Sequence, residues 1–239
     1  MAVTALMALM AIMRGASHFR PSRRQQSMLA AMPAARRKRR TYHHGDLERA
    51  LVDASIALLA KKGMDAFTLR EVSRHVGVSH AAVYRHFADK SAMLEAIAVR
   101  GYQELTECLR AAIADVPRTR VEKRLLAIGV AYVMFALEQE PRFRVMTRPR
   151  REELRSPELD SAIDAALGVL IGVARDGVDT GVLRKAPPLD HAVRVYLLAY
   201  GYASLFLLGR LRVRPEKVES YLRSLMAPLV AALRTEVNE

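Results

Sequence analysis

Residues 68–87 determine the fold of this chain, and they read Thr68-Leu-Arg-Glu-Val-Ser-Arg-His-Val-Gly-Val-Ser-His-Ala-Ala-Val-Tyr-Arg-His-Phe87. Thr68, followed three residues later by Glu71, forms a capping box, which predicts that a helix begins here. Gly77 stands where that helix needs a left-handed residue to end, and Ser79 can cap a second helix. Two helices joined by so short a turn cross steeply, so the segment predicts a helix-turn-helix.

The apolar residues of this segment predict which face of each helix is buried. Leu69, Val72 and Val76 recur at helical spacing, and Val83 and Phe87 lie four apart on the second helix. Small, basic and aromatic side chains remain on the opposite face of the second helix: Ala81, Tyr84, Arg85 and Ala88, with His80 and His86 on its flanks. Small residues let a helix approach base edges, and an arginine can donate two hydrogen bonds to one guanine. We therefore predict readout of double-stranded DNA, with an ordinary helical hairpin as the alternative.

The run from Gly77 to Leu94 also resembles the signature of TetR/AcrR-type transcriptional regulators. That signature is Gly-Val-Ser, then a hydrophobic residue with Tyr-x-His-Phe, then a Lys before a long linking helix, and the strong similarity covers about residues 42–100. The resemblance implies that Tyr84 and Lys90 hold phosphates, with Thr68 and His86 as helpers. Together with base readout by Arg85, the predicted DNA-binding residues are Thr68, Ser79, His80, Ala81, Tyr84, Arg85, His86 and Lys90.

Positive charge is concentrated at the N-terminus. The 239 residues carry a formal net charge of +13, and residues 1–45 contain nine Lys or Arg and no acidic residue. A basic arm beside a DNA-reading domain raises non-specific affinity for phosphates. Arg36–Arg40 favour such a contact, whereas a solvated tail explains Arg14–Arg24 equally well. Residues 1–13 are apolar enough to suggest a signal peptide, but the run is short and the positive charges follow it instead of preceding it. We therefore interpret residues 1–31 as a disordered extension or an upstream start-codon assignment.

The helical periodicity and the Pro and Gly positions predict an all-α protein without strands. The first helix is expected from Asp46 to about Lys62, ended by Gly63, and Pro141 is expected to end a later helix before an arginine-rich loop. We predict a disordered basic extension over residues 1–40, a three-helix helix-turn-helix domain over 41–92, and a larger ligand-sensing and dimerisation domain over 93–239. Beyond the helix-turn-helix, helices are expected over 90–114, 121–138, 157–175, 189–208 and 215–236.

The last two predicted helices are candidates for a dimer interface. The fifteen residues between Arg194 and Arg210, of which the last follows helix 189–208, are uncharged and too few to span a membrane, so this helix is expected to be buried on every side. Paired across a two-fold axis, two such helices per chain would form the four-helix interface that TetR-like proteins use. The final helix carries one apolar stripe, in which Leu222 and Leu225 are expected to face the partner: Val218, Tyr221, Leu222, Leu225, Leu229 and Leu233.

The C-terminal half shows no catalytic constellation, no Gly-rich phosphate loop and no metal-spaced His pair. We therefore expect no enzyme activity, cofactor or metal, and assign this half to ligand sensing and dimerisation. The Tyr196-x-x-x-Tyr200-Gly201 spacing resembles the Trp-x-x-x-His-Gly element of one C-terminal TetR subfamily. Arginines 142, 144, 148, 150 and 151 could meet an anionic ligand, although a solvated loop is the favoured interpretation. The candidate effector-binding residues, for which ordinary core packing is the alternative, are Cys108, Tyr132, Met134, Phe135 and Met146.

These patterns together predict a homodimeric, cytoplasmic and nucleoid-associated repressor. It would bind an inverted-repeat operator and be released by an unidentified small-molecule effector. The single Cys108 fits a reducing compartment. An architectural DNA-binding protein without an effector is the alternative, in which the basic arm supplies non-specific contacts.

Overall fold

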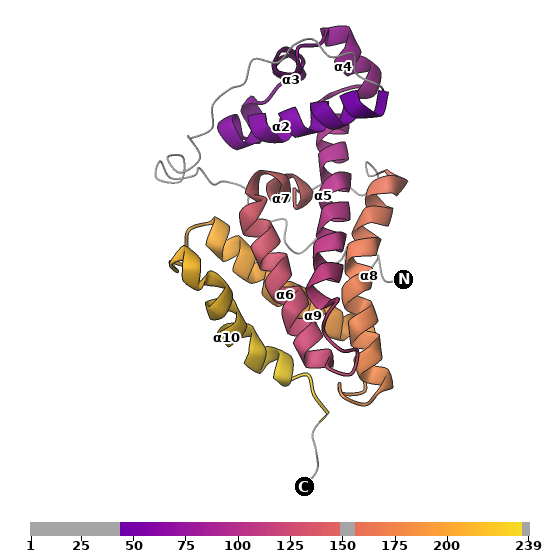
Figure 1. Cartoon of the computed structure of the whole chain (residues 1–239), viewed down its shortest axis with the longest axis vertical. Helices are drawn as coiled ribbons and strands as arrows, with labels where there is room; N and C mark the ends of the chain where they lie inside the picture. Colours follow the sequence, from indigo (N-terminus) through magenta and orange to yellow (C-terminus); the bar gives the residue numbers. More distant parts are fainter. Residues whose placement is uncertain (1–43, 149–155, 236–239) are drawn as a thin grey trace. The chain divides into compact units, whose positions relative to one another are not determined.

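The computed structural model describes residues 44–148 and 156–235, and the described residues are predominantly helical (Figure 1). Among them the only β pairing is an isolated bridge between Leu183 and Arg234, so the predicted all-α class is confirmed. The chain divides into two compact units between Ile97 and Ala98. This division lies inside one continuous helix, α5 (Lys90–Ile113), a few residues beyond the predicted boundary at 92/93.

The N-terminal unit is a small helical domain with its own core. It contains α2 (His44–Ala66), α3 (Leu69–Val76) and α4 (His80–His86), and α3 packs on both of the others. Gly63 has a φ of 77° and a ψ of 174°, which are not helical, so the regular first helix is interrupted at Gly63 as predicted, and a short helical segment follows to Ala66. The core of this unit includes Leu51, Phe67, Val72, Val83, Phe87 and Ile97.

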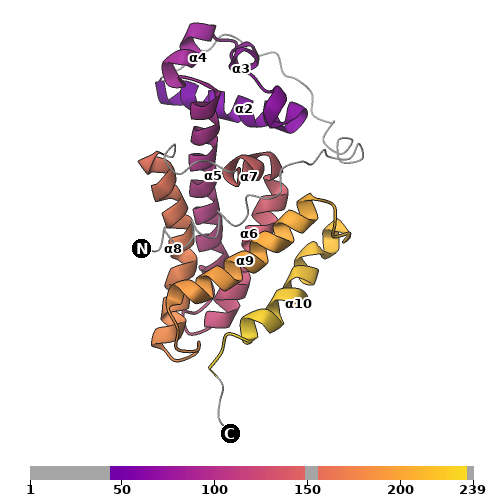
Figure 2. The same cartoon turned by 180° about the vertical axis from the view of Figure 1, so that it is seen from behind.

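The C-terminal unit is built around α6 (Val121–Glu138). Helix α6 packs against α7 (Glu140–Met146), α8 (Pro157–Asp179), α9 (Pro188–Leu207) and α10 (Val218–Ala231) (Figures 1 and 2). A short 3₁₀ helix, η3 (Pro215–Lys217), precedes α10, so the predicted helix 215–236 is shorter than expected. Within the described part of the chain, no helix combines the length and the hydropathy that a membrane span requires.

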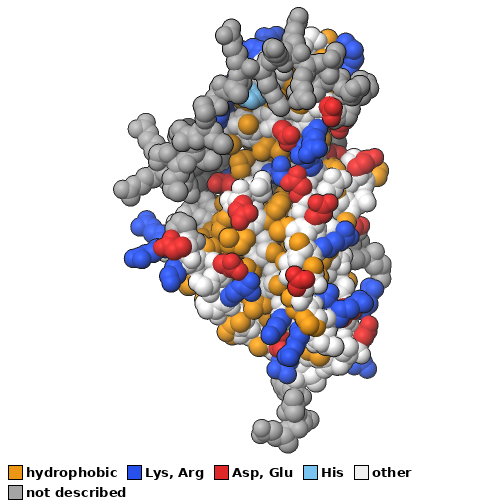
Figure 3. Space-filling view, in the orientation of Figure 1, with side chains coloured by type: hydrophobic (Ala, Val, Ile, Leu, Met, Phe, Trp, Pro, Cys, Tyr) orange, Lys and Arg blue, Asp and Glu red, His pale blue; other side chains and the backbone are white. Residues whose placement is uncertain are grey.

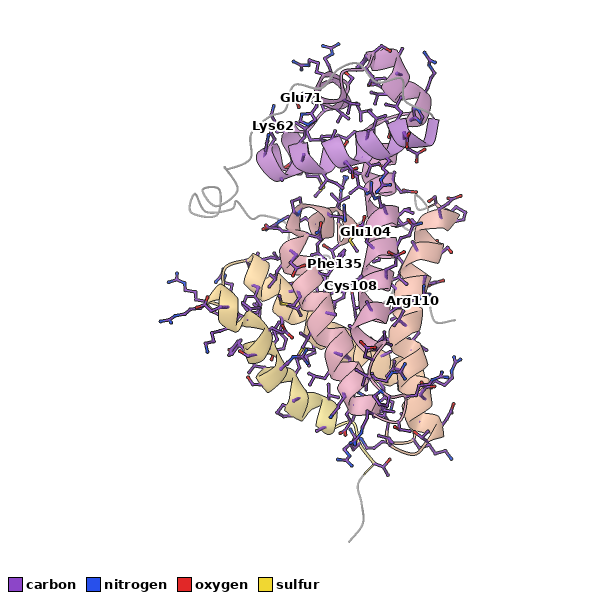
Figure 4. All side chains as sticks on the ribbon, in the orientation of Figure 1. Lys62, Glu71, Glu104, Cys108, Arg110 and Phe135 are labelled. Atoms are coloured by element: carbon purple, nitrogen blue, oxygen red, sulfur yellow. The ribbon has the colours of Figure 1, made fainter. Side chains whose placement is uncertain are left out.

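Helix α7 corrects the prediction of an arginine-rich loop. Pro141 lies in the first turn of α7, where a missing backbone N–H costs no hydrogen bond, so it starts a helix instead of only ending one. Arg142 is buried and forms an ion pair with Glu104 of α5, which Figure 4 labels. The backbone of α5 lies close to α7, because a Cβ at Gly101 would come 2.6 Å from the Met146 sulfur. Arg150 and Arg151 lie outside the described residues.

The single chain leaves part of the apolar surface of α9 and α10 exposed. In the single chain α9 is not buried on every side, because Leu197 and Leu205 are about two-fifths exposed. On α10, Leu222 is completely buried, whereas Leu229 is 49% exposed. The apolar stripe predicted on α10 is therefore divided between the core of the unit and solvent. Figure 3 shows hydrophobic side chains gathered over the face that α6 and α10 present in that view, with charged side chains around them.

Candidate nucleic-acid interface

Local hydrogen bonds fix the starts of α3 and α4 and the turn between the two helices. The Thr68 hydroxyl accepts from the Glu71 N–H at 3.3 Å, and the Ser79 hydroxyl accepts from the Ala82 N–H at 3.2 Å. Gly77 is left-handed, with a φ of 78° and a ψ of 31°, which a residue with a side chain adopts only with strain. The N–H of the next residue, Val78, donates to the Ser73 carbonyl at 3.0 Å and closes the helix end. The predicted helix-turn-helix is confirmed.

An ion pair connects α3 to α2. The Lys62 ammonium donates to the Glu71 carboxylate, and Figure 4 shows these two side chains near one another. This hydrogen bond is the main reason that the pKa of Glu71 lies below its ordinary value, and the hydrogen bonds with Thr68 add to the effect. The capping residue therefore also links the start of the helix-turn-helix to the first helix of the unit.

Helix α4 presents a mixed face to solvent. Val83 and Phe87 are buried, as predicted, while Ala81, Tyr84 and Arg85 are exposed. Tyr84 is 47% exposed and is the one large hydrophobic side chain of α2 to α4 that is exposed, and its ring packs against the His80 ring at a steep angle with centroids 4.7 Å apart. The helix thus holds one face rigidly against the unit and offers the other to a partner.

His86 and Lys90 lie differently from Tyr84 and Arg85. The His86 side chain is only 11% exposed, and its Nδ1 lies 4.0 Å from the Glu48 carboxylate of α2. The Lys90 ammonium donates to the Asp65 carbonyl at 3.1 Å and lies 5.5 Å from the centre of the Phe67 ring. Both side chains therefore contact their own unit. A phosphate contact by His86 or Lys90 remains a prediction, and it requires the side chain to bind the phosphate in addition to these contacts or in place of them.

Two exposed arginines of α3 were not among the predicted DNA-binding residues. Arg70 and Arg74 lie one turn apart, and the Arg74 guanidinium donates to the Arg70 carbonyl at 3.4 Å. Residues four apart lie on the same face of a helix, so the sequence already indicated an exposed basic pair that could contact DNA phosphates. Thr68 is exposed beside them and keeps its predicted place at the start of α3.

The C-terminal unit contains a cavity of about 50 Å³ between α5, α6, α8 and α9. Of the five predicted effector residues, only Tyr132 lines it. Phe135 and Met146 are buried elsewhere in the core, and Cys108 and Met134 are half-buried outside the cavity; Figure 4 labels Cys108 and Phe135. Burial, with the nearby charge of Glu138, raises the pKa of the Cys108 thiol, as expected for a structural cysteine.

Comparisons with known proteins identify the family. The model of the N-terminal domain described as "Bacterial regulatory proteins, tetR family" matches residues 51–97, and the model described as "Tetracyclin repressor-like, C-terminal domain" matches residues 125–229. These two regions contain the helix-turn-helix and most of the C-terminal unit described above. The chain belongs to the TetR family of transcriptional regulators and contains that family's DNA-binding domain.

Individual relatives agree with this assignment. The regulator BetI of Cronobacter sakazakii is 30% identical over 80 residues, which are 34% of this chain and 40% of BetI. The chain thus spans about two-fifths of the length of this relative. The Mycobacterium tuberculosis transcriptional repressor Rv3405c is 25% identical over 150 residues, which are 61% of this chain and 78% of the repressor.

Solved structures resemble this chain over about four-fifths of its length. A protein of unknown function from Rhodococcus sp. RHA1 has 26% identity and a TM-score of 0.72, covering 83% of this chain and 100% of its own. The TetR-family regulator PfmR of Thermus thermophilus has 20% identity and a TM-score of 0.58, covering 78% of this chain and 99% of its own. At 20% identity the second comparison shows the fold alone.

Proposed function

We propose that this regulator is a dimeric repressor, which binds an inverted-repeat operator through α4 and is released when a small molecule occupies its C-terminal unit. The exposed face of α4 carries the proposal. It combines Ala81, small enough for close approach to base edges, with the exposed Tyr84 and Arg85. The repressor Rv3405c, which aligns with more than half of the chain, supports the sign of regulation. Such a protein would act on the nucleoid, in the cytoplasm.

The apolar surface of the C-terminal unit supports dimerisation. Apart from Tyr84 on α4, the large hydrophobic side chains that are exposed among the described residues are Leu197, Leu205, Leu208 and Leu229. They come from α9, its C-terminal cap and α10, and both helices pack on α6. Exposed apolar surface is unfavourable in water, and a second copy of the chain is the partner always present. Two-fold symmetry then predicts half-sites arranged as an inverted repeat.

Helix α5 supports release by a ligand. It supplies Lys90 to the N-terminal unit and Tyr102 to the lining of the C-terminal cavity. A ligand that contacts α5 therefore acts on a helix that both units share. If the ligand prefers a conformation that does not fit the operator, linkage requires that it weakens DNA binding.

Gel-shift assays would separate this proposal from an architectural DNA-binding protein. The operator would first be selected from fragments of genomic DNA, beginning with the region upstream of the gene itself. A repressor is expected to hold its operator against an excess of unrelated DNA, with a defined footprint at two half-sites. Ready loss of binding to unrelated competitor, without a footprint, would favour the architectural alternative.

Arg85→Ala is expected to cost about 1–3 kcal/mol of operator affinity and to relax specificity at one base position. Arg85 is exposed beside Ala81 on the free face of α4, so its guanidinium can reach a base edge. Binding to the operator and to single-base variants would be compared by fluorescence anisotropy. Lys61→Ala, at an exposed position of α2, is the control. Equal losses on operator and random DNA would assign Arg85 to the phosphate backbone instead.

Lys90→Ala is expected to weaken binding to all DNA sequences alike and to lower the salt slope of log affinity by about one unit. Because Lys90 also holds the Asp65 carbonyl, the variant should lower the free energy of unfolding by about 1 kcal/mol. Salt titrations and thermal melts measure the two effects, and Lys61→Ala should leave stability unchanged. An unchanged salt slope, with lower stability, would show that Lys90 is structural only.

A further inference from the structure

Among the residues that the structure describes, none with a charged side chain lines the cavity of the C-terminal unit. It is lined by aliphatic residues, by the small residues Gly129, Ala166 and Ala199, and by three phenols, Tyr102, Tyr132 and Tyr196. An ion moved from water into such a site loses hydration without gaining a partner of opposite charge, which is costly. An uncharged ligand does not incur this cost. The chemistry of the wall therefore discriminates between ligands by their charge.

The three phenols differ in whether their hydroxyl protons are already used in hydrogen bonds within the protein. The Tyr102 hydroxyl donates to the Met146 carbonyl at 3.3 Å. Tyr132 and Tyr196 are hydrogen-bonded to one another, with rings 5.8 Å apart and nearly perpendicular. Burial raises the pKa of both phenols, so both are protonated at neutral pH. One hydrogen bond between two hydroxyls uses only one of their two protons, so the pair keeps one proton for a ligand oxygen, and Tyr196 is the less buried of the two.

The neutral state of the phenols also affects how well the cavity can bind a cation. Because burial holds Tyr132 and Tyr196 in the protonated form, neither supplies a negative charge for an ammonium group. Aromatic faces could still attract a cation, but the Tyr132 ring already makes edge contacts with both Phe143 and Tyr196. The free space of about 50 Å³ favours a compact molecule over a long acyl chain.

We propose that the effector of this regulator is a compact, uncharged and largely apolar molecule with one hydroxyl or carbonyl oxygen, which accepts a hydrogen bond from Tyr196. That this ligand regulates DNA binding rests on the proposed function. That the cavity binds the ligand does not depend on DNA. The proposal predicts that carboxylates, phosphates and ammonium ions bind this cavity more weakly than neutral molecules of the same shape.

Three probes of matched shape test the charge rule: cyclohexanol, cyclohexanecarboxylate and cyclohexylammonium. Binding to the full chain, without DNA, would be measured by thermal shift and by tyrosine emission, which is readable because the chain has no Trp. Cyclohexanol is expected to bind at least tenfold more tightly than either ion. Equal or tighter binding of the ammonium or the carboxylate overturns the proposal, and so does the absence of binding by all three.

Two variants place the ligand in the cavity. Tyr196→Phe removes one hydroxyl and is expected to weaken cyclohexanol about three- to tenfold. Tyr202→Phe, the same change on α9 but outside the cavity wall, should have no effect. Ala166→Leu should abolish binding by filling the space, and if this variant fails to fold, the Tyr196 pair decides. Equal affinities of the Tyr196 and Tyr202 variants overturn the proposal.

The DNA experiments remain separate. A chain that binds its operator but none of the neutral probes would retain the proposed function and lose this inference. A chain that binds cyclohexanol through Tyr196 but no operator would retain the site and lose the function.

Discussion

Leu229→Arg is expected to convert the dimer into folded monomers and to reduce operator affinity by more than tenfold. In the single chain Leu229 is 49% exposed, so an arginine there remains solvated and the unit keeps its fold. In the proposed dimer the same side chain would be buried without a partner of opposite charge, once in each copy, which costs several kcal/mol. A monomer presents one α4 and contacts one half-site, so most of the operator affinity is lost.

Sedimentation velocity, circular dichroism and operator titrations measure the three parts of this expectation. Ser224→Arg is the matched control, because it adds the same charge at an exposed polar position of α10. The control should remain dimeric and bind normally. A Leu229→Arg protein that is still dimeric and still holds its operator would contradict the proposed interface.

The helix-turn-helix could be predicted from sequence because its determinants are local. The hydroxyls of Thr68 and Ser79 accept hydrogen bonds from residues three positions later, and Gly77 ends α3 in the left-handed conformation. Each of these signals lies within one turn of the residue that it controls. Helical spacing alone predicted that Val83 and Phe87 are buried, because α4 packs with one face against the rest of its small unit.

Helix α7 could not be predicted in the same way. Pro141 is compatible with the end of one helix and with the first turn of the next, so the local signal is ambiguous. What favours the helix is distant in sequence: Glu104 pairs with Arg142, and Gly101 leaves room for Met146. An arginine-rich segment looks solvated until its partner carboxylate is known.

The cavity was missed for a related reason. Tyr132 and Phe135 are both buried on α6, but only Tyr132 faces the space enclosed with α8 and α9. Helical periodicity identifies buried faces and does not say which neighbour covers each of them. Tyr196 belongs to the Tyr-x-x-x-Tyr-Gly motif, which the sequence shows. Its place in the cavity wall, however, depends on how α9 packs against α6 and α8.

The same limit applies to α10, where it leads to a second large effect. Leu222→Arg is expected to unfold the C-terminal unit instead of separating two copies. Leu222 is completely buried, together with Met226 and Val230 of the same helix. A Cβ at Gly129 of α6 would overlap the Met226 methyl carbon, so the two helices approach closely at this point. A guanidinium at position 222 would have to be buried between these closely packed helices.

The expected loss for Leu222→Arg is about 4 kcal/mol or more, because a cavity-type loss of the leucine adds to the burial of an unpaired charge. That is a large part of the roughly 5–15 kcal/mol typical of a folded domain. Urea unfolding followed by circular dichroism measures the loss, and Leu222→Met, which preserves volume and apolarity, should cost less than about 1.5 kcal/mol. Periodicity alone placed Leu222 in the dimer seam. A Leu222→Arg chain that is fully folded and monomeric, like the one expected for Leu229→Arg, would restore that interpretation and remove Leu222 from the core.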